Sequence, residues 1–367
     1  MNILVLYQSP WWNAAAYYSY NLIKSLINNE HRVVFAGKAD SPLALKLNEF
    51  GIELHDIDLF VNSPFRFIKN ITTVKKIIKV EKIDHLVPVS APGHIILGIL
   101  KKFYKVKLPV IKVCLDNIPP RNNVFNRYLH NKLTDFFIFP GRSTKDRYKT
   151  AFVINKFQIL HPPLEFKEFI NYLPEENTKR TIGIPEDKIL VSFIGRFSPE
   201  KGIFFLLDII KATLKKSDKI FFLLSGSEEQ IKHDEVKQKI KEHELENNVK
   251  IIDKADDVRK LINIADLGIL TSRYSEFICR IAMEFMAFKK PVVAPNLNVI
   301  PEVVEHRKSG FIYELEDADM AAEFVVKLAN NTKLINEMGE NGFKRISEHY
   351  SMEVFSEEVE KILEQVQ

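Results

Sequence analysis

Two glutamates, Glu276 and Glu284, are spaced so that one precedes a predicted helix and the other lies within it. We predict that this helix begins near Phe277 and runs through Ala287 or Phe288. Free amides at a helix N-terminus and the positive end of the helix dipole suit an anionic ligand. Glu284, two turns into the helix, could present its carboxylate to neutral hydroxyls. A phosphate next to a sugar is the ligand shape that this combination predicts.

The predicted helix lies between two apolar runs, residues 265–270 and 291–295, which are typical of buried strands. The order strand, helix, strand indicates a βαβ unit. Earlier in the chain, residues 189–194 form another such run and lead into Arg196 and Lys201. We expect these two residues to supply fixed positive charge beside the N-terminus of the next helix.

The stretch from Arg273 to Glu302 resembles the Glu-x7-Glu signature of retaining glycosyltransferases of family 4. Other segments resemble that family's pattern in the same order. They are the lead-in at 180–188, the Gly-Arg-x4-Lys-Gly loop at 194–202, and a downstream run made of 291–294, 301–304 and 309–311. A lone Glu-x7-Glu arises often by chance, but such a series in the right order is specific. The resemblance covers most of the C-terminal half.

The resemblance implies an α/β fold of GT-B architecture, in which two Rossmann-like doubly wound domains face a central cleft. A length of 367 residues also favours two domains. We expect an acceptor-binding domain over 1–170, a polar linker over 171–188 and a nucleotide-sugar-binding domain over 189–350. The terminal helix, in 351–367, would cross back to the first domain.

The resemblance further implies a role for each matching residue. Glu276 would contact the transferred sugar, Glu284 the ribose hydroxyls, and Arg196 and Lys201 the diphosphate, in a site that needs no metal. The other donor-side candidates are the turn glycine, a residue near the nucleobase and the residues that follow the first glutamate: Gly195, Lys254, Ile278, Cys279 and Arg280. The family usually reads Glu-Gly-Phe-Gly here, whereas this chain has bulkier residues after Glu276, and Arg280 could supply charge that the glycines did not need.

These implied roles describe a hexosyltransferase that uses a nucleotide diphosphate sugar, UDP- or GDP-linked, and a glycan or lipid-linked acceptor, with no cofactor. Retention without an obvious nucleophile implies attack from the same face of the sugar. Cell-surface polysaccharide synthesis is the expected setting. A non-catalytic GT-B subunit that binds a glycan or a protein partner is the alternative. A sugar-nucleotide epimerase would need acid and base carboxylates facing the sugar, and the sequence does not show them.

The acceptor side has weaker signals. The loop after the first strand contains Trp11, Trp12 and Asn13 where the family usually has glycines. The tryptophans suit stacking of an acceptor sugar or covering of the cleft, and the alternative is that they pack between domains. His94 and Asp116 follow predicted strands and are candidates for contact with the sugar, although a lone histidine is more often structural.

The charge is unevenly distributed. Residues 1–174 contain 24 Lys and Arg against 13 Asp and Glu, and the remainder contains 28 against 35. Residues 63–82 form a basic amphipathic pattern, which could rest on an anionic membrane or could simply be a core-facing helix with a solvated basic face. Nucleic acid is disfavoured because no recognised binding module accompanies the charge. The two cysteines and the apolar N-terminal strand favour a cytoplasmic location, and contact of the basic half with lipid would place the protein at the inner face of the membrane.

Overall fold

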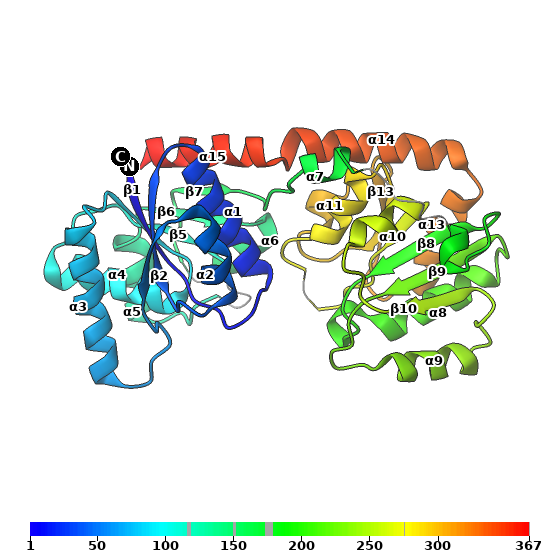
Figure 1. Ribbon diagram of the computed structural model, residues 1–367, viewed down its shortest axis with the longest axis horizontal. Coiled ribbons are helices and arrows are strands. Elements are labelled where there is room, and N and C mark those ends of the chain that lie inside the picture. Colours follow the sequence, from blue (N-terminus) through cyan, green and yellow to red (C-terminus); the bar gives the residue numbers. More distant parts are fainter. Residues whose placement is uncertain (116–118, 150–151, 173–178, 275, 367) are drawn as a thin grey trace. The chain divides into compact units, whose positions relative to one another are not determined.

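The computed structural model describes residues 1–115, 119–149, 152–172, 179–274 and 276–366. It divides into two compact units (Figure 1). Unit 1 comprises Met1–Pro163 and Met352–Gln367, and unit 2 comprises Leu164–Ser351.

The unit boundary lies earlier than the expected boundary at residue 170. Residues 164–170 belong to unit 2, because the Phe166 ring packs on Phe343, with centroids 5.0 Å apart, and the Phe169 ring packs on Phe288 at 5.7 Å. The end of the expected linker also belongs to unit 2, where Lys179 forms an ion pair with Asp266 at 2.6 Å.

Unit 1 contains parallel strands in the order β3-β2-β1-β4, and a parallel bridge between Leu86 and Val110 continues this sheet into β5-β6-β7. The strands are β1 (Asn2–Leu6), β2 (Arg32–Gly37), β3 (Glu53–Asp56), β4 (His85–Pro88), β5 (Ile111–Val113), β6 (Phe136–Phe139) and β7 (Phe157–Ile159). The order reverses between β1 and β4, which is the switch point of a doubly wound sheet.

The helices of unit 1 begin where their sequences supply a cap or a proline. Asn13 caps the first helix by accepting from the Ala16 amide at 2.9 Å, and Ser41 caps the second. Pro64 occupies the first turn of the third. The helices are α1 (Ala14–Asn28), α2 (Pro42–Leu47), α3 (Pro64–Val80), α4 (Ala91–Tyr104), α5 (Val124–Lys132) and α6 (Arg142–Lys149).

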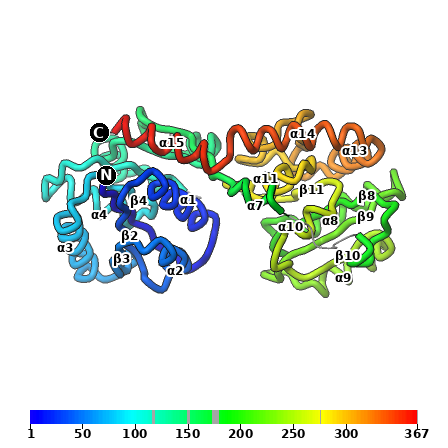
Figure 2. Tube along the Cα trace, turned by 45° about the horizontal axis from the view of Figure 1, so that its top comes forward, coloured from blue at the N-terminus to red at the C-terminus, as the bar shows by residue number. Residues whose placement is uncertain are grey.

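The last helix of the chain, α15 (Met352–Gln365), belongs to unit 1 and packs on α1 (Figures 1 and 2). The Tyr18 ring lies edge-on to Phe355 at 5.6 Å, and the Asn29 side-chain amide donates to the Ser356 carbonyl at 2.9 Å. The chain's end is therefore part of the first unit's core.

Unit 2 contains a parallel sheet in the order β10-β9-β8-β11-β12-β13. Its strands are β8 (Ile189–Ile194), β9 (Ile220–Ser225), β10 (Val249–Ile252), β11 (Leu267–Ile269), β12 (Val292–Pro295) and β13 (Gly310–Tyr313). Its helices are α7 (Lys167–Ile170), α8 (Ile203–Leu214), α9 (His233–Glu242), α10 (Val258–Ile264), α11 (Arg280–Ala287), α12 (Ile300–Val303), α13 (Ala318–Ala329) and α14 (Thr332–His349). The first and fourth strands of this unit, β8 and β11, are neighbours, as in a Rossmann fold.

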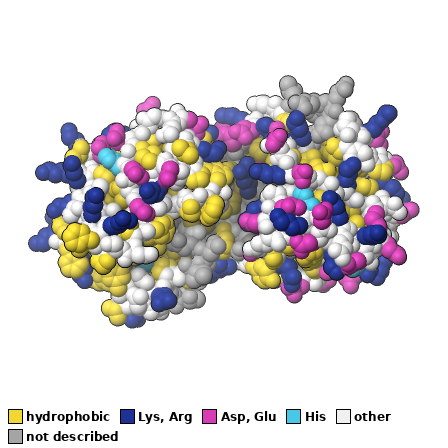
Figure 3. Space-filling view, turned by 60° about the horizontal axis from the view of Figure 1, so that its bottom comes forward, with side chains coloured by type: hydrophobic (Ala, Val, Ile, Leu, Met, Phe, Trp, Pro, Cys, Tyr) yellow, Lys and Arg dark blue, Asp and Glu magenta, His cyan; other side chains and the backbone are white. Residues whose placement is uncertain are grey.

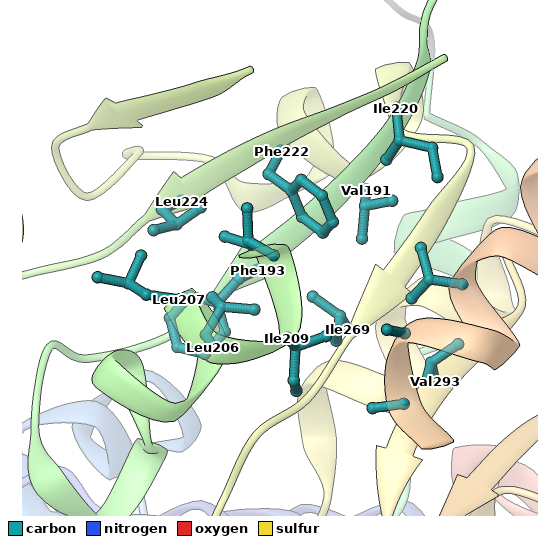
Figure 4. Packing of buried hydrophobic residues seen from close by; sticks show 14 of the residues in the cluster. Val191, Phe193, Leu206, Leu207, Ile209, Ile220, Phe222, Leu224, Ile269 and Val293 are labelled. Atoms are coloured by element: carbon teal, nitrogen blue, oxygen red, sulfur yellow. The ribbon is translucent and has the colours of Figure 1, made fainter. Parts of the chain in front are cut away.

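The core of unit 2 explains why its strands read as continuous apolar runs. Both faces of β8 and β9 are covered, so Val191 and Phe222 are fully buried, and helix α8 packs Leu206 and Ile209 against them (Figure 4). Burial of each such side chain contributes about 1.5–3 kcal/mol. This packing fixes the carboxyl ends of the strands, from which the candidate site is built.

Candidate active site

The candidate site lies at the switch point of unit 2, where β8 and β11 are paired in parallel. Both carboxyl ends lie at one edge of the sheet, so the loop that follows each strand begins there. Lys201 comes from the loop after β8 and Glu276 from the loop after β11. The Lys201 ammonium lies 2.5 Å from Oε2 of Glu276, and the Ser272 hydroxyl donates to the same oxygen at 2.8 Å. The fold therefore brings together a cation and a carboxylate that are far apart in sequence.

Backbone contacts lock these two loops together. Gly202 has φ of 67°, and a Cβ built there would lie 2.1 Å from the Thr271 carbonyl oxygen. The Thr271 hydroxyl donates to the Lys201 carbonyl at 2.7 Å, and the Arg273 amide donates to the Glu200 carbonyl at 2.9 Å. The left-handed glycine thus permits the close approach that holds Lys201 in place.

Two helix N-termini begin at these loops. Helix α8 follows Gly202 and α11 follows Cys279, and neither helix has a described side-chain cap or an acidic residue in its first turn. The amides and the positive dipole ends at these N-termini suit an anionic ligand, and the nearest preceding carboxylates in sequence are Glu200 before α8 and Glu276 before α11.

Helix α11 begins at Arg280, three residues later than the sequence predicts. The predicted start near Phe277 is wrong because Cys279 has φ of 54°, in the left-handed region, which a helix cannot include. Cys279 occupies the position of the second glycine in the family's Glu-Gly-Phe-Gly pattern and adopts a conformation that glycine favours. Its side chain is fully buried, and burial raises the pKa of its thiol well above the usual value. Ile278 beside it is also buried.

Glu284 is buried on α11 with one described cation beside it. Its Oε1 atom accepts from Nε of Arg280 at 2.7 Å, while about half of the Arg280 side chain is exposed. Burial raises the pKa of Glu284, and Arg280 partly opposes this effect. A buried carboxylate with a raised pKa reduces stability, and functional sites often contain such groups.

The other donor-side candidates lie at strand ends but not in the Lys201–Glu276 contact. Gly195 follows β8, and its amide donates to the Ser225 carbonyl at 2.9 Å. Arg196 is exposed and forms an ion pair with Glu229 at 2.5 Å. Lys254 is exposed, two residues after β10. Sequence reasoning did not assign roles to Ser272 and Glu229; the position of Ser272 two residues after the apolar run at 265–270 was the one available signal.

The acceptor-side tryptophans are on the surface of unit 1. Trp11 is 72% exposed. Trp12 packs edge-on against Tyr20 at 5.9 Å, and the Lys46 ammonium lies 4.7 Å from its ring centroid. The side chain of Asn13 caps α1, so it has a structural role. Next to this loop is a cavity of about 220 Å³, lined by Gln8, Ser9, Pro10, Lys38, Asp40, Ser41 and Pro42.

His94 is in the interior of unit 1. It lies in the first turn of α4, is 2% exposed, hydrogen-bonds Thr134 at 2.8 Å and packs edge-on against His130. Burial lowers its pKa well below the usual value, and Lys112 adds to the effect. The expected place of His94 at a strand end is corrected, because α4 begins at Ala91 and turns this side chain into the core. Its contact with the sugar stays a prediction. Asp116 lies outside the described residues.

One group of three potential metal ligands occurs within the described residues: Glu53, His55 and Glu81 in unit 1. Glu81 already forms an ion pair with Arg32 at 2.6 Å. This group belongs to unit 1, whereas the candidate donor residues belong to unit 2. Among the described residues, no helix has the length and apolar character needed to cross a membrane.

A parallel doubly wound unit with a cation, carboxylates and two helix N-termini at its switch point suits a ligand that carries phosphate. Residues 174–345 match the family model described as glycosyl transferases group 1. The chain is 26% identical to a capsular polysaccharide biosynthesis glycosyltransferase, CapM, of Staphylococcus aureus over 181 residues, 48% of this chain and 46% of that protein. It is 30% identical to a poly(ribitol-phosphate) α-N-acetylglucosaminyltransferase of the same species over 165 residues, 45% of this chain and 33% of that protein.

Solved structures of other proteins can be superposed on this chain over its full length. Anabaena HepE in complex with UDP has a TM-score of 0.85 at 19% identity and covers 100% of both chains. A glycosyltransferase from Rickettsia africae has a TM-score of 0.86 at 20% identity and covers 100% of this chain and 98% of that one. The alignments span roughly half of the CapM relative (46%) and a third of the poly(ribitol-phosphate) α-N-acetylglucosaminyltransferase (33%). The chain has the GT-B fold, and slightly less than half of it, residues 174–345, matches the group 1 glycosyltransferase model.

Proposed function

We propose that the chain is a retaining glycosyltransferase of family 4 that transfers a hexose-type sugar from a nucleotide diphosphate sugar to a glycan or lipid-linked acceptor. Cell-surface polysaccharide synthesis is the setting suggested by the CapM relative. UDP is the favoured nucleotide, since the structurally similar HepE was solved with UDP.

The contact between Lys201 and Glu276 is the observation that carries this proposal. When the glycosidic bond to a nucleoside diphosphate breaks, negative charge grows on the β-phosphate. A lysine fixed beside that phosphate stabilises the transition state without having to reorganise. Glu276 holds the ammonium in position and can accept hydrogen bonds from the hydroxyls of the transferred sugar. The N-termini of α8 and α11 add the positive ends of their helix dipoles to the charge of Lys201.

Glu284 is assigned to the ribose hydroxyls. Arg280 occupies its Oε1 atom, so a ribose would bind the other oxygen or displace the half-exposed arginine. Hydroxyl donors would stabilise the carboxylate that burial destabilises. Arg196 is assigned to the diphosphate, which requires it to exchange Glu229 for a phosphate. An arginine makes this exchange readily at an exposed site, because surface ion pairs are weak.

The reaction proceeds by attack of the acceptor hydroxyl on the face from which the nucleotide leaves. The departing phosphate takes the hydroxyl proton, the new glycosidic bond forms, and the old bond breaks with its electron pair remaining on the phosphate. In this proposal, Lys201, Arg196 and the helix dipoles do the work that a divalent cation does in metal-dependent enzymes. We therefore expect a chelator to leave nucleotide binding unchanged.

The test is ligand-induced thermal stabilisation with UDP, GDP, ADP and their common sugar conjugates. Lys201→Met is compared with Lys188→Met, because Lys188 lies at the opposite end of β8 and binds the Asp218 carbonyl. One nucleotide should stabilise wild type and Lys188→Met, and Lys201→Met should lose about tenfold or more in affinity. Equal nucleotide binding by the two lysine variants would contradict the assigned site.

The alternative is a non-catalytic GT-B subunit that binds a glycan or a partner protein. The observation that favours it is the exposed Trp11 in a loop without the family's glycines. A folded wild-type protein that binds a glycan but neither binds any nucleotide nor hydrolyses any nucleotide sugar would favour this alternative.

A further inference from the structure

Three helices of unit 1 share an unusual charge composition. Helices α3, α4 and α5 together carry nine lysines and arginines and no aspartate or glutamate. Five of the nine are on α3, and Lys105 extends the series directly after α4. Ordinary solvated helix faces mix both signs of charge. A face of one sign points to a partner of the opposite sign.

The same helices expose large apolar side chains. On α3, Phe65 is 87% exposed, and Ile68 lies one turn further along the same face. On α5, Val124 is 76% exposed, and Phe125 and Tyr128 share its face. Phe103 and Tyr104 end α4, and Phe103 is 68% exposed. We call these seven side chains and the lysines among them the basic–aromatic face.

Contacts between helices show that the basic–aromatic face is continuous. The ammonium of Lys75 on α3 lies 4.4 Å from the ring centroid of Tyr104 on α4. The ammonium of Lys102 on α4 lies 4.6 Å from the ring of Tyr128 on α5 and 5.3 Å from that of Phe103. Figure 3 shows hydrophobic side chains among lysines and arginines at the α3 end of unit 1. Cations and rings alternate across all three helices.

From this face we infer that unit 1 docks on the surface of an anionic lipid membrane. Lysines attract the anionic headgroups, and aromatic rings favour the interface between headgroups and acyl chains. The exposed aliphatic side chains Ile68 and Val124 favour a lipid membrane over a hydrophilic polyanion as the partner. They gain free energy by entering acyl chains, whereas a nucleic acid or another hydrophilic polyanion offers them no apolar surface.

This inference rests on the proposed function in one respect only: if the acceptor is lipid-linked, the face places unit 1 where that acceptor lies. Lipid binding itself needs neither nucleotide nor acceptor. The two proposals can therefore fail separately.

The experiment is flotation of the full chain with vesicles of phosphatidylcholine alone and with vesicles of equal parts phosphatidylcholine and phosphatidylglycerol, at low and high salt. The apolar variant combines Ile68→Ser, Phe103→Ser and Val124→Ser. The charge variant combines Lys75→Glu and Lys102→Glu. Exposed residues elsewhere provide matched controls: Leu45→Ser on α2 and Lys215→Glu in unit 2.

We expect wild type and both controls to float with the anionic vesicles only, and less at high salt. Both face variants should lose about tenfold or more in partitioning, with unchanged thermal unfolding, since they replace exposed side chains. If the triple variant unfolds early, Phe103→Ser and Val124→Ser alone should shift partitioning in the same direction.

Several results would overturn the inference. They are no flotation of wild type, equal flotation of all variants, and loss in the charge variant alone, which would indicate a hydrophilic polyanion instead of a membrane. Flotation without nucleotide binding would retain the membrane surface and remove the transferase assignment.

Discussion

Replacing Gly202 with alanine should damage both the stability of unit 2 and its binding site. Gly202 has φ of 67°, which costs an alanine about 1–2 kcal/mol. The new Cβ would also lie 2.1 Å from the Thr271 carbonyl oxygen, more than 1 Å inside ordinary contact. The Thr271 hydroxyl donates a hydrogen bond to the Lys201 carbonyl, so a forced shift of Thr271 also moves the loops that position Lys201 and Glu276. Overpacking of this kind adds about 1–3 kcal/mol.

Gly183 is a matched control in the same unit. It has the same φ of 67°, but its Cβ would meet only the flexible end of Lys250, at 3.1 Å. Gly183→Ala therefore measures the left-handed conformation alone, about 1–2 kcal/mol, whereas Gly202→Ala should cost roughly 2–5 kcal/mol.

The assay is calorimetric unfolding with and without nucleotide. For a unit of this size, each kcal/mol lowers the melting temperature by roughly 2–4 °C. Gly202→Ala should melt clearly below Gly183→Ala and should lose nucleotide stabilisation, which Gly183→Ala retains. If the two variants melt together and both bind nucleotide, the close approach at Thr271 does not hold the site and the reasoning is refuted.

Three further predictions concern residues of unit 2. Burial raises the pKa of Glu284, so the native state favours its protonated form, and this group's contribution to stability is lost as pH rises through the folded pKa. Glu284→Gln should therefore become more stable relative to wild type as pH rises. A difference in melting temperature that stays constant across acidic pH would contradict this. Gly195 is not in a left-handed conformation, and its Cβ would lie 3.3 Å from the Phe193 ring and 4.0 Å from Cγ of Lys201. Gly195→Ala should therefore change the melting temperature little but weaken nucleotide binding in a titration. A large loss of stability would show instead that this glycine is structural. Asp266 accepts hydrogen bonds from Lys179 at 2.6 Å and from the Leu190 amide at 2.7 Å. Asp266→Ala should therefore lower the free energy of unfolding, measured in urea, by about 1–3 kcal/mol and leave nucleotide affinity unchanged. Loss of affinity in the folded variant would place Asp266 in the site.

Periodic patterns in the sequence were sufficient for the class of fold. The alternation of apolar runs with helical patterns predicted parallel doubly wound sheets, and the GT-B architecture is confirmed. These signals are local, since the pattern of a buried strand or an amphipathic helix can be recognised within about ten residues. The motif residues Arg196, Lys201, Glu276 and Glu284 could be selected as candidates for the same reason, although their roles stay predictions.

Local backbone conformation was harder to predict from the sequence. The start of α11 was placed too early because a cysteine at position 279 gives no sign of a positive φ, which the glycine of the usual pattern would have given. His94 was taken as a strand-end residue, but one turn of helix directs it into the core, where it meets Thr134. Both errors arise where tertiary packing overrides the preference of the residue.

The sequence by itself determined which elements form, in what order, and which residue types stand at their ends. The tertiary structure alone decided which of those residues meet. Lys201 pairs with Glu276 because β8 and β11 are neighbours in the sheet, whereas Arg196, a few residues earlier in the same loop, pairs with Glu229 instead. Glu284 is buried beside Arg280 because the apolar stripe of α11 faces the core. Contacts of this kind depend on sheet order and packing, which no short stretch of sequence contains.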